Sequence, residues 1–404
     1  MCCDTHCVVP QRDPASARSC ERAFSFRDAT DALRKASLRN SSVAAQLTVL
    51  DDDICCQVAA AVPPPALHGA PQELPFVDAE AWLADLGPEV AGGLIQTMHQ
   101  VDPHPAPVEH IAGGSEWGYR RWAAYRQSPS GLASYASKRN DFLSPNAVSR
   151  LSAHHHFGMV SPFTVACEAA SVGATKFVDE FLVWRELSYA FCAKRMVPHD
   201  RVLEMLPKWA AKTLTEHAGN PRPRALARQQ LEHAKTGDVF WDAMCNDFDI
   251  VSGRVSRIFL RSMSPDTCCA MYFAWCAGLL DADWGVWSAA VGFRQTCLVR
   301  HGELHNNIRM TWGKAFLPWA PSPRDALVWA LELNHRYALD GGDPCSYSGV
   351  LWCFGGFDSP KASTNTPISG SIRQRPTSKH SRQSQRYGEL VRATYAAPVL
   401  APLK

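Results

Sequence analysis

Residues 309–352 read RMTWGKAFLPWAPSPRDALVWALELNHRYALDGGDPCSYSGVLW, and this stretch decides the fold. Within it Trp312 and Trp319 are seven positions apart, so both fall on one face of a helix. The Pro-Ser-Pro sequence at 321–323 predicts the end of that helix and the start of a second one. The sequence DGGDP at 340–344 predicts a sharp turn that carries two carboxylates. Tryptophans at helical spacing are usually core residues, and this remains the alternative to a functional role.

The composition of the 404-residue chain is typical of a globular protein with one or two hydrophobic cores. Its formal net charge is only +2, so any contact with DNA would depend on local patches. No apolar run is long enough for a membrane helix, and the first residues, MCCDTHCVVP, lack the regions of a signal peptide. We therefore expect an intracellular protein without a membrane span, and the sequence does not distinguish nucleus, chloroplast and cytoplasm.

The 15 cysteines are scattered through a long chain, and we expect them to be reduced thiols rather than disulfides. Two groups might be taken for metal ligands, residues 2, 3 and 7 and residues 268, 269 and 276, but neither has paired spacing with matching histidines. Three successive histidines at 154–156 point in different directions on a helix and cannot converge on one ion. The sequence therefore predicts no metal site.

Residues 1–114 alternate short apolar pieces with a helical piece at 23–38 and proline-rich connectors, which predicts part of an α/β region. A parallel sheet needs its early strands and crossovers to bury both of its faces. We therefore expect this incomplete sheet to be poorly ordered, with linkers at 69–75 and 103–107.

From Glu116 onward the pattern becomes helical, with predicted helices at 116–126, 131–139 and 177–192. Residues 149–152, Ser-Arg-Leu-Ser, place hydroxyls and a cation just before a helix, where a phosphate can bind. An ordinary serine N-cap is the alternative. Glu180 and Trp184 are four residues apart and share one helix face, and their plain interpretation is a solvated carboxylate and a core ring.

Several motifs, in a fixed order, resemble the photolyase/cryptochrome flavoproteins, and within them the class II cyclobutane-dimer photolyases and their bacterial-type relatives. The motifs that carry the resemblance are YASKRND, VSRLSAHHHFGMVSP, DEFLVWREL, FWDAM, RMTWGK, LPWAPSP, LNHRYALDGGDP and GVLW. The resemblance implies an all-helical FAD-binding domain at residues 115–357, preceded by a truncated α/β antenna-like region at 1–114. There CVVP and ERAFSFRDAT resemble a late strand and the helix after it.

Residues 245–294 interrupt the resemblance, because joining Met244 directly to Gln295 restores one family-like helix. We interpret this segment as an insertion, such as a retained intron. The tail at 358–404 is rich in Ser, Thr and Arg, and we expect it to be disordered or to lie on the surface.

The resemblance implies light-driven, FAD-dependent repair of cyclobutane pyrimidine dimers, with UV-damaged DNA as the partner and a monomeric enzyme. No antenna chromophore is carried over, since the front of the chain is incomplete. The cofactor-binding residues that it implies are Tyr135, Arg139, Ser149, Arg150, Leu151, Ser152, Arg309, Asn334, Asp340 and Asp343. Among them Asn334 matches the position that faces the flavin N5 edge, and Arg309 and Asp340 match a salt-bridged pair beside the flavin ring.

The resemblance also implies a lesion pocket. Glu180 would bind a pyrimidine of the dimer by a hydrogen bond, Trp184 would pack against it, and Trp352 would supply the other wall. With Asn334, these are the implied catalytic residues. Trp241, Trp312 and Trp319 match the photoreduction relay of the family.

Two further features remain open at this point. The chain departs from the family's proline-tyrosine-leucine at Ala153, His154 and His155, which affects the expected local packing. The basic cluster of Arg222, Arg224 and Arg228 is either a solvated face or an edge that contacts phosphate, and Arg373 and Arg375 of the tail could also approach DNA.

Two other functions compete with repair. A cryptochrome-like photoreceptor would use the same flavin without repairing DNA, and a truncated, intron-retaining product would be inactive. The presence of Glu180, Trp184 and Trp352 favours repair, because a receptor has no need for a pyrimidine clamp.

Overall fold

The computed structural model describes parts of residues 1–39 and 108–404. The described residues are 7–9, 15, 18, 20–39, 108, 111–144, 146–222, 224–232, 236–238, 298, 302–361 and 366–376. The predictions for residues 40–107, for the insertion at 245–294, for Trp241 and for the end of the tail lie outside these residues.

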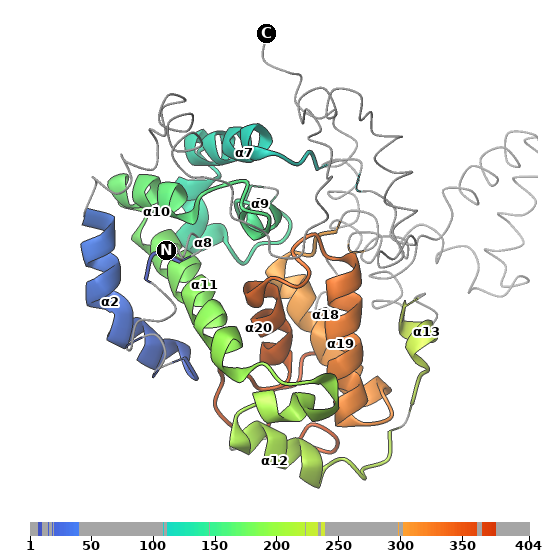
Figure 1. The fold of residues 1–404 in the computed structure, drawn as a ribbon. Helices are drawn as coiled ribbons and strands as arrows, with labels where there is room; N and C mark the ends of the chain where they lie inside the picture. Colours follow the sequence, from blue (N-terminus) through green and yellow to red (C-terminus); the bar gives the residue numbers. More distant parts are fainter. Residues whose placement is uncertain are drawn as a thin grey trace, which may run out of the picture. The chain divides into compact units, whose positions relative to one another are not determined.

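The described part of the chain is helical, which confirms the fold class predicted for residues 115–357. The only β pairing among the described residues is an isolated bridge between Thr366 and Gly370. Figure 1 shows the helices, which in chain order are α2 (Ala23–Arg39), α7 (Ser115–Gln127), η1 (Leu132–Ser134), α8 (Tyr135–Lys138), α9 (Ser152–His156), α10 (Pro162–Ser171), α11 (Thr175–Arg195), η2 (His199–Met205), α12 (Lys208–Glu216), α13 (Arg228–Glu232), α18 (Asn306–Trp319), α19 (Pro323–Tyr337) and α20 (Pro344–Cys353).

The predicted breaks between α18, α19 and α20 are confirmed, and local capping explains them. The Ser322 hydroxyl accepts a hydrogen bond from the backbone N–H of Asp325 at 3.1 Å, and Pro323 occupies the first turn of α19. In the same way the Asp343 carboxylate accepts from the backbone N–H of Cys345 at 2.7 Å, just before α20. Both helices therefore begin at side chains that satisfy otherwise unpaired backbone donors.

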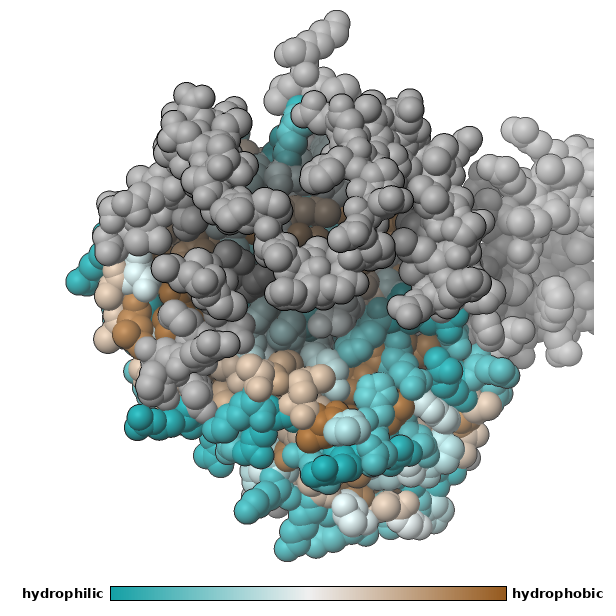
Figure 2. All heavy atoms as spheres, in the orientation of Figure 1, coloured by the Kyte–Doolittle hydropathy of each residue, from teal (hydrophilic) through white to brown (hydrophobic). Residues whose placement is uncertain are grey.

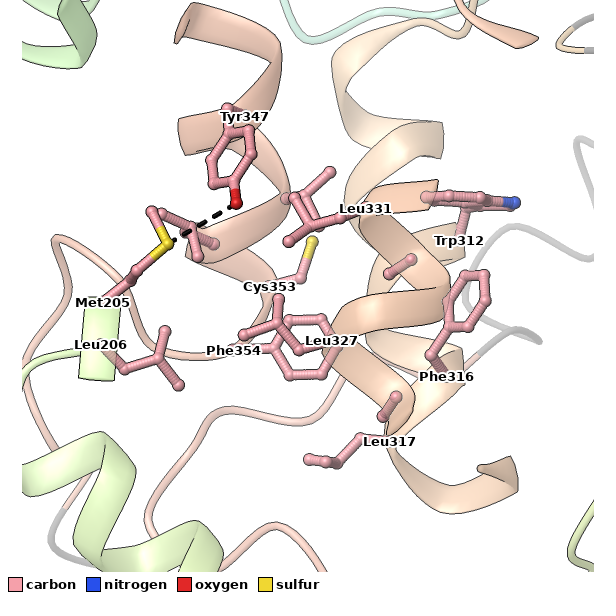
Figure 3. Close-up of a cluster of buried hydrophobic side chains, with 14 of the residues drawn as sticks. Met205, Leu206, Trp312, Phe316, Leu317, Leu327, Leu331, Tyr347, Cys353 and Phe354 are labelled. Carbon is pink, nitrogen blue, oxygen red and sulfur yellow. Dashed lines mark hydrogen bonds between the residues drawn. The ribbon is translucent and has the colours of Figure 1, made fainter. Parts of the chain in front are cut away.

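The main hydrophobic core lies where α11, α18, α19 and α20 pack against one another. Figure 3 shows Trp312 and Phe316 of α18 on this core, beside Leu327 and Leu331 of α19. Full burial of a large apolar side chain stabilises a fold by about 1.5–3 kcal/mol, so these contacts hold the helix triplet in place. The outer face differs, since hydrophilic side chains make up most of the lower described surface in Figure 2.

The N-terminal residues pack on this helical unit, and the strand predicted at residues 7–10 is not observed at the described residues 7–9. The backbone N–H groups of Val8 and Val9 instead donate to one oxygen of Glu186 on α11, at 2.9 and 3.0 Å. The helix predicted at 23–38 is confirmed as α2, which packs against α10 and α11. These residues therefore satisfy their backbone donors on a buried carboxylate.

The beginning of the tail packs on the helices, as one of the two expectations for it, a position on the surface, allows. Residues 366–376 form a C-terminal strap that buries Ile368 and Ile372. The Lys314 ammonium of α18 holds the strap by donating to the carbonyls of Cys353 and Arg373, at 3.1 and 2.9 Å. None of the helices that the structure describes is long and apolar enough to cross a membrane.

Candidate functional site

A cavity of about 410 Å³ opens between the segment before α9, helix α11, the start of α18 and the turn into α20. Nine of the residues expected to form the site line it, namely Ser149, Arg150, Leu151, Ser152, Glu180, Trp184, Arg309, Asp340 and Asp343. The expected site residues Tyr135, Arg139, Asn334 and Trp352 are not part of its lining. Segments that are far apart in the sequence therefore meet at one cavity.

In the segment before α9, the hydroxyls of Ser149 and Ser152 do not cap the helix. The N-cap residue of α9 is Leu151, without a side-chain cap, so the alternative of an ordinary serine N-cap is not observed. Arg150 has a φ of 56°, a left-handed conformation that is rare for a residue with a side chain. Its Nε donates to Glu303 at 2.7 Å, across the cavity wall. Such strained residues concentrate at functional sites.

Arg309 and Asp340 form a buried ion pair at the cavity. The two guanidinium Nη atoms donate to the two carboxylate oxygens at 3.2 and 3.1 Å. The Ser346 hydroxyl accepts from Arg309 Nη1 at 3.2 Å and from Asn334 Nδ2 at 2.8 Å. Asn334 is fully buried on α19, so it reaches the cavity wall through Ser346.

Asp343 anchors a second polar group in the wall. Besides capping α20, its carboxylate accepts from the Tyr189 hydroxyl at 3.0 Å and lies 3.3 Å from His156 Nδ1. Burial raises the pKa of Tyr189, which keeps the phenol protonated as a donor. Arg185 Nη2 in turn donates to the Tyr189 oxygen at 3.2 Å, so a buried guanidinium also lines the cavity.

His155 lines the cavity as a neutral imidazole. Burial, followed by the positive charge of Arg185, lowers the pKa of His155 to about 4. Its Nδ1 lies 2.9 Å from the Val160 carbonyl and therefore carries the proton, which leaves Nε2 as an acceptor. The sequence departs from the family at this position, and the structure shows that the departure concerns the cavity wall.

No protein-family model matches the chain. It is 30% identical to the deoxyribodipyrimidine photo-lyase of Oryza sativa subsp. japonica over 248 residues, which are 60% of this chain and 38% of that protein. The photo-lyase of Methanothermobacter thermautotrophicus is 30% identical over 243 residues, 60% of this chain and 42% of that protein. The photo-lyase of Arabidopsis thaliana is 29% identical over 248 residues, 60% and 39% of the two chains.

The chain is a sequence relative of the deoxyribodipyrimidine photo-lyases. It spans between 38% and 42% of the length of these three proteins. The resemblance that the motifs carry is therefore confirmed at the level of the photo-lyase family.

The lesion residues expected from photo-lyases are arranged differently from the prediction. The rings of Trp184 and Trp352 contact each other, with centroids 4.3 Å apart and planes at 38°, so they do not form opposite walls of a gap. Glu180 is held by three donors, Lys176 Nζ at 2.6 Å, Arg139 Nη2 at 3.3 Å and Trp184 Nε1 at 2.9 Å. Arg139, expected at the flavin, thus pairs with the expected lesion carboxylate.

The expected site residues Tyr135, Trp312 and Trp319 are not part of the cavity lining. Tyr135 packs edge-on against Phe177 with a centroid distance of 5.1 Å, and burial raises its pKa to about 12. Trp312 and Trp319 are buried on α18, and Trp312 contacts Phe316 edge-on at 4.8 Å. Their place in an electron relay stays a prediction.

The three arginines of the basic cluster make contacts within the protein, so the cluster is not simply a solvated face, and its contact with phosphate stays a prediction. Arg222 donates to the carbonyls of residues 218 and 220, Arg224 to the carbonyl of Thr236, and Arg228 pairs with Glu332 at 3.2 Å. Arg375 of the strap donates to the Asn307 side chain at 3.3 Å. Among the described residues, no group of three or more His, Cys, Asp or Glu could hold a metal ion.

Sequence reasoning missed several cavity residues, namely His155, Arg185, Glu303, His305, Cys345 and Ser346. Four of them carried a signal, because His155 and Arg185 lie in the VSRLSAHHHFGMVSP and DEFLVWREL motifs and the other two, Cys345 and Ser346, directly follow the DGGDP turn. For the rest, only the three-dimensional arrangement identifies them.

Proposed function

We propose that this chain binds FAD in the cavity and uses it for light-driven repair of cyclobutane pyrimidine dimers in DNA. The observation that carries the proposal is the convergence on one cavity of nine residues that the photo-lyase resemblance implies for flavin and lesion. The sequence similarity to proteins named photo-lyases supports the same family of activity.

The donors and acceptors in the wall fit a flavin nucleotide. Asn334 Oδ1 is buried and has no hydrogen-bond partner among the described residues, which is costly unless a ligand supplies a donor. In the cavity lining, the hydroxyls of Ser149 and Ser152, which do not cap α9, lie next in sequence to the Arg150 cation, a combination that suits a pyrophosphate. We therefore assign Asn334 to the flavin ring and residues 149–152 to the phosphates.

When bound and reduced, FAD supplies an electron to the dimer under light, and the protein provides placement and electrostatics. The Arg309–Asp340 pair gives the ring a polar neighbour without net charge, and burying either charge alone would be unfavourable. Glu180 and Trp184 stand at the α11 side of the cavity, where they would orient the lesion. The Glu180 carboxylate must exchange at least one of its present donors for the pyrimidine.

A specific observation favours the photoreceptor as the second candidate. The carboxylate of Glu180 is occupied by Lys176, Arg139 and Trp184, and the rings of Trp184 and Trp352 leave no gap between them. A lesion end closed in this way would serve a flavoprotein that never admits a base. Both candidate functions use FAD, but only the repair enzyme would split a pyrimidine dimer.

The test is to express the chain with and without residues 245–294 and to record the visible absorption of the purified proteins. We expect flavin absorption from at least the shortened form. The flavin is then reduced and illuminated with an oligonucleotide that contains one thymine dimer, and chromatography measures the restored thymines. Bound flavin without repair would favour the receptor, whereas protein without flavin, even after refolding with FAD, would remove both readings.

A further inference from the structure

We infer that Ser346 is a positioning residue that fixes the Asn334 amide and couples it to the Arg309–Asp340 pair. The inference rests on the proposed flavin site and concerns a residue to which neither the motifs nor the comparisons assign a role. It starts from the hydrogen bonds of a single hydroxyl, which is buried and lines the cavity.

The Ser346 hydroxyl has one hydrogen to donate and two lone pairs to accept with. One lone pair accepts from Asn334 Nδ2 at 2.8 Å and the other from Arg309 Nη1 at 3.2 Å. The hydroxyl donates its hydrogen to Asp340 Oδ1, and the distance from Ser346 Oγ to this oxygen is long, 3.5 Å. The hydroxyl therefore joins three side chains that come from α18, α19 and the turn before α20.

The consequence for Asn334 is a fixed orientation of its amide. Its NH₂ group is turned toward Ser346, while Oδ1 has no partner among the described residues. An amide that lost the serine could rotate, because no other acceptor for Nδ2 is recorded in the described part of the chain. Ser346 thus determines which end of the amide is held, so that the acceptor Oδ1 is the atom left without a partner among the described residues.

The backbone holds Ser346 rigidly enough for this task. It is the third residue of α20, two positions after Pro344 and three after the Asp343 cap, so its backbone position is set in the first turn of the helix. Positioning groups on regular elements control geometry more tightly than groups on loops. By contrast, the Arg309–Asp340 pair alone would leave the amide without a fixed partner.

The test is a double-mutant cycle with Ser346→Ala, Asn334→Ala and the double variant, measured as the FAD dissociation constant by fluorescence titration and as the midpoint potential of the bound flavin. We expect Ser346→Ala to weaken FAD binding roughly tenfold. In the Asn334→Ala background the same change should have almost no further effect on either quantity, since Ser346 acts through Asn334.

The matched control is Ser348→Ala, which removes a buried hydroxyl two residues further along α20, outside the contacts with Asn334, Arg309 and Asp340. It should leave FAD affinity within about twofold of the wild type, a small difference on the free-energy scale. The side-chain amide of Asn334, observed by ¹⁵N NMR after selective labelling, gives a readout without flavin, and its signal should shift in Ser346→Ala but not in Ser348→Ala.

Additive effects of the two substitutions, or an unchanged Asn334 amide signal in Ser346→Ala, would overturn the inference. This failure is distinct from failure of the proposed function. If the wild-type protein does not bind FAD, the proposed flavin site is wrong. If the wild-type protein binds FAD and Ser346→Ala does not change this binding, only the role of Ser346 is wrong.

Discussion

Trp184 of α11 and Trp352 of α20 lie in ring contact, with centroids 4.3 Å apart. Only Trp184 lines the cavity, so Trp352 supports it from behind the cavity wall. A base that enters the cavity would therefore meet the exposed side of this pair, or would have to separate the two rings. Either route makes lesion binding sensitive to Trp352, although Trp352 itself does not line the cavity.

Replacing Trp352 by Ala should leave flavin bound and should weaken binding of dimer-containing DNA relative to undamaged DNA by about 1–3 kcal/mol, the scale of one base–aromatic contact. The physical reason is the loss of the ring that supports Trp184. Competition titrations with matched oligonucleotides measure the difference. Phe24→Ala, at an exposed ring of α2, is the control and should change nothing. Equal loss for both oligonucleotides would argue against a lesion role.

Replacing Glu180 by Gln should lower the repair yield per absorbed photon more than it lowers DNA affinity. The carboxylate would act mainly on the charged state of the dimer that follows light absorption, and that interaction is not needed for binding. Parallel measurements of quantum yield and dissociation constant test this. The neighbouring Asp179, which pairs with Arg27 of α2 at 2.7 Å, offers a control in Asp179→Asn. A yield that falls only as far as binding does would contradict the prediction.

Replacing Asp340 by Asn should destabilise the protein by about 3–5 kcal/mol, because Arg309 would be left as a buried charge without its partner. Urea unfolding with a fixed slope provides the measurement. The exposed pair between Lys35 and Asp31 is the control, and Lys35→Ala should change the free energy of unfolding by less than about 1 kcal/mol. Similar values for both variants would show that the Arg309–Asp340 pair is effectively solvated.

The protein should lose stability as the pH falls from about 6.5 to about 4, partly through His155. Its pKa is about 4 in the fold and about 6.5 in the unfolded chain. Between these two pH values His155 is protonated in the unfolded chain and neutral in the fold. The free energy of unfolding therefore decreases as the pH is lowered. Arg185 and His154 oppose protonation of His155, and Asp343 favours it.

The contribution of His155 should reach about 3 kcal/mol at the acidic end of this window. His155→Phe should therefore flatten the dependence of stability on pH by that amount, as measured by urea unfolding at several pH values. His335, whose pKa burial also lowers to about 4, provides a second variant with the same expected behaviour. A dependence that keeps its full slope in both variants would show that other groups cause it.

The sequence predicted the helices better than the contacts between them. The boundaries of α18, α19 and α20 depend on serine, proline and aspartate close to each helix start, which is local information. The contact between Trp184 and Trp352 joins two helices, and residue spacing within one helix says nothing about it. Ser346 was missed because a serine in the first turn of a helix is ordinary, and only the partners of its hydroxyl distinguish it.

The two ends of the described chain were the hardest to predict. A short apolar segment such as residues 7–9 has the composition of a strand, and its donors were satisfied instead by Glu186, far along the chain. The attachment of the strap could not be predicted from its polar composition, because it depends on the burial of Ile368 and Ile372 and on the hydrogen bonds of Lys314.

The bond between Val8 and Glu186 also sets the order in which the chain can fold. The two residues are 178 positions apart. At a synthesis rate of about 5–20 residues per second, Glu186 is synthesised roughly 9–36 s after Val8. The strap at 366–376 is made later still, although it closes on α18. Contacts of such long range slow folding, so the cavity should be completed only after most of the nascent chain has left the ribosome.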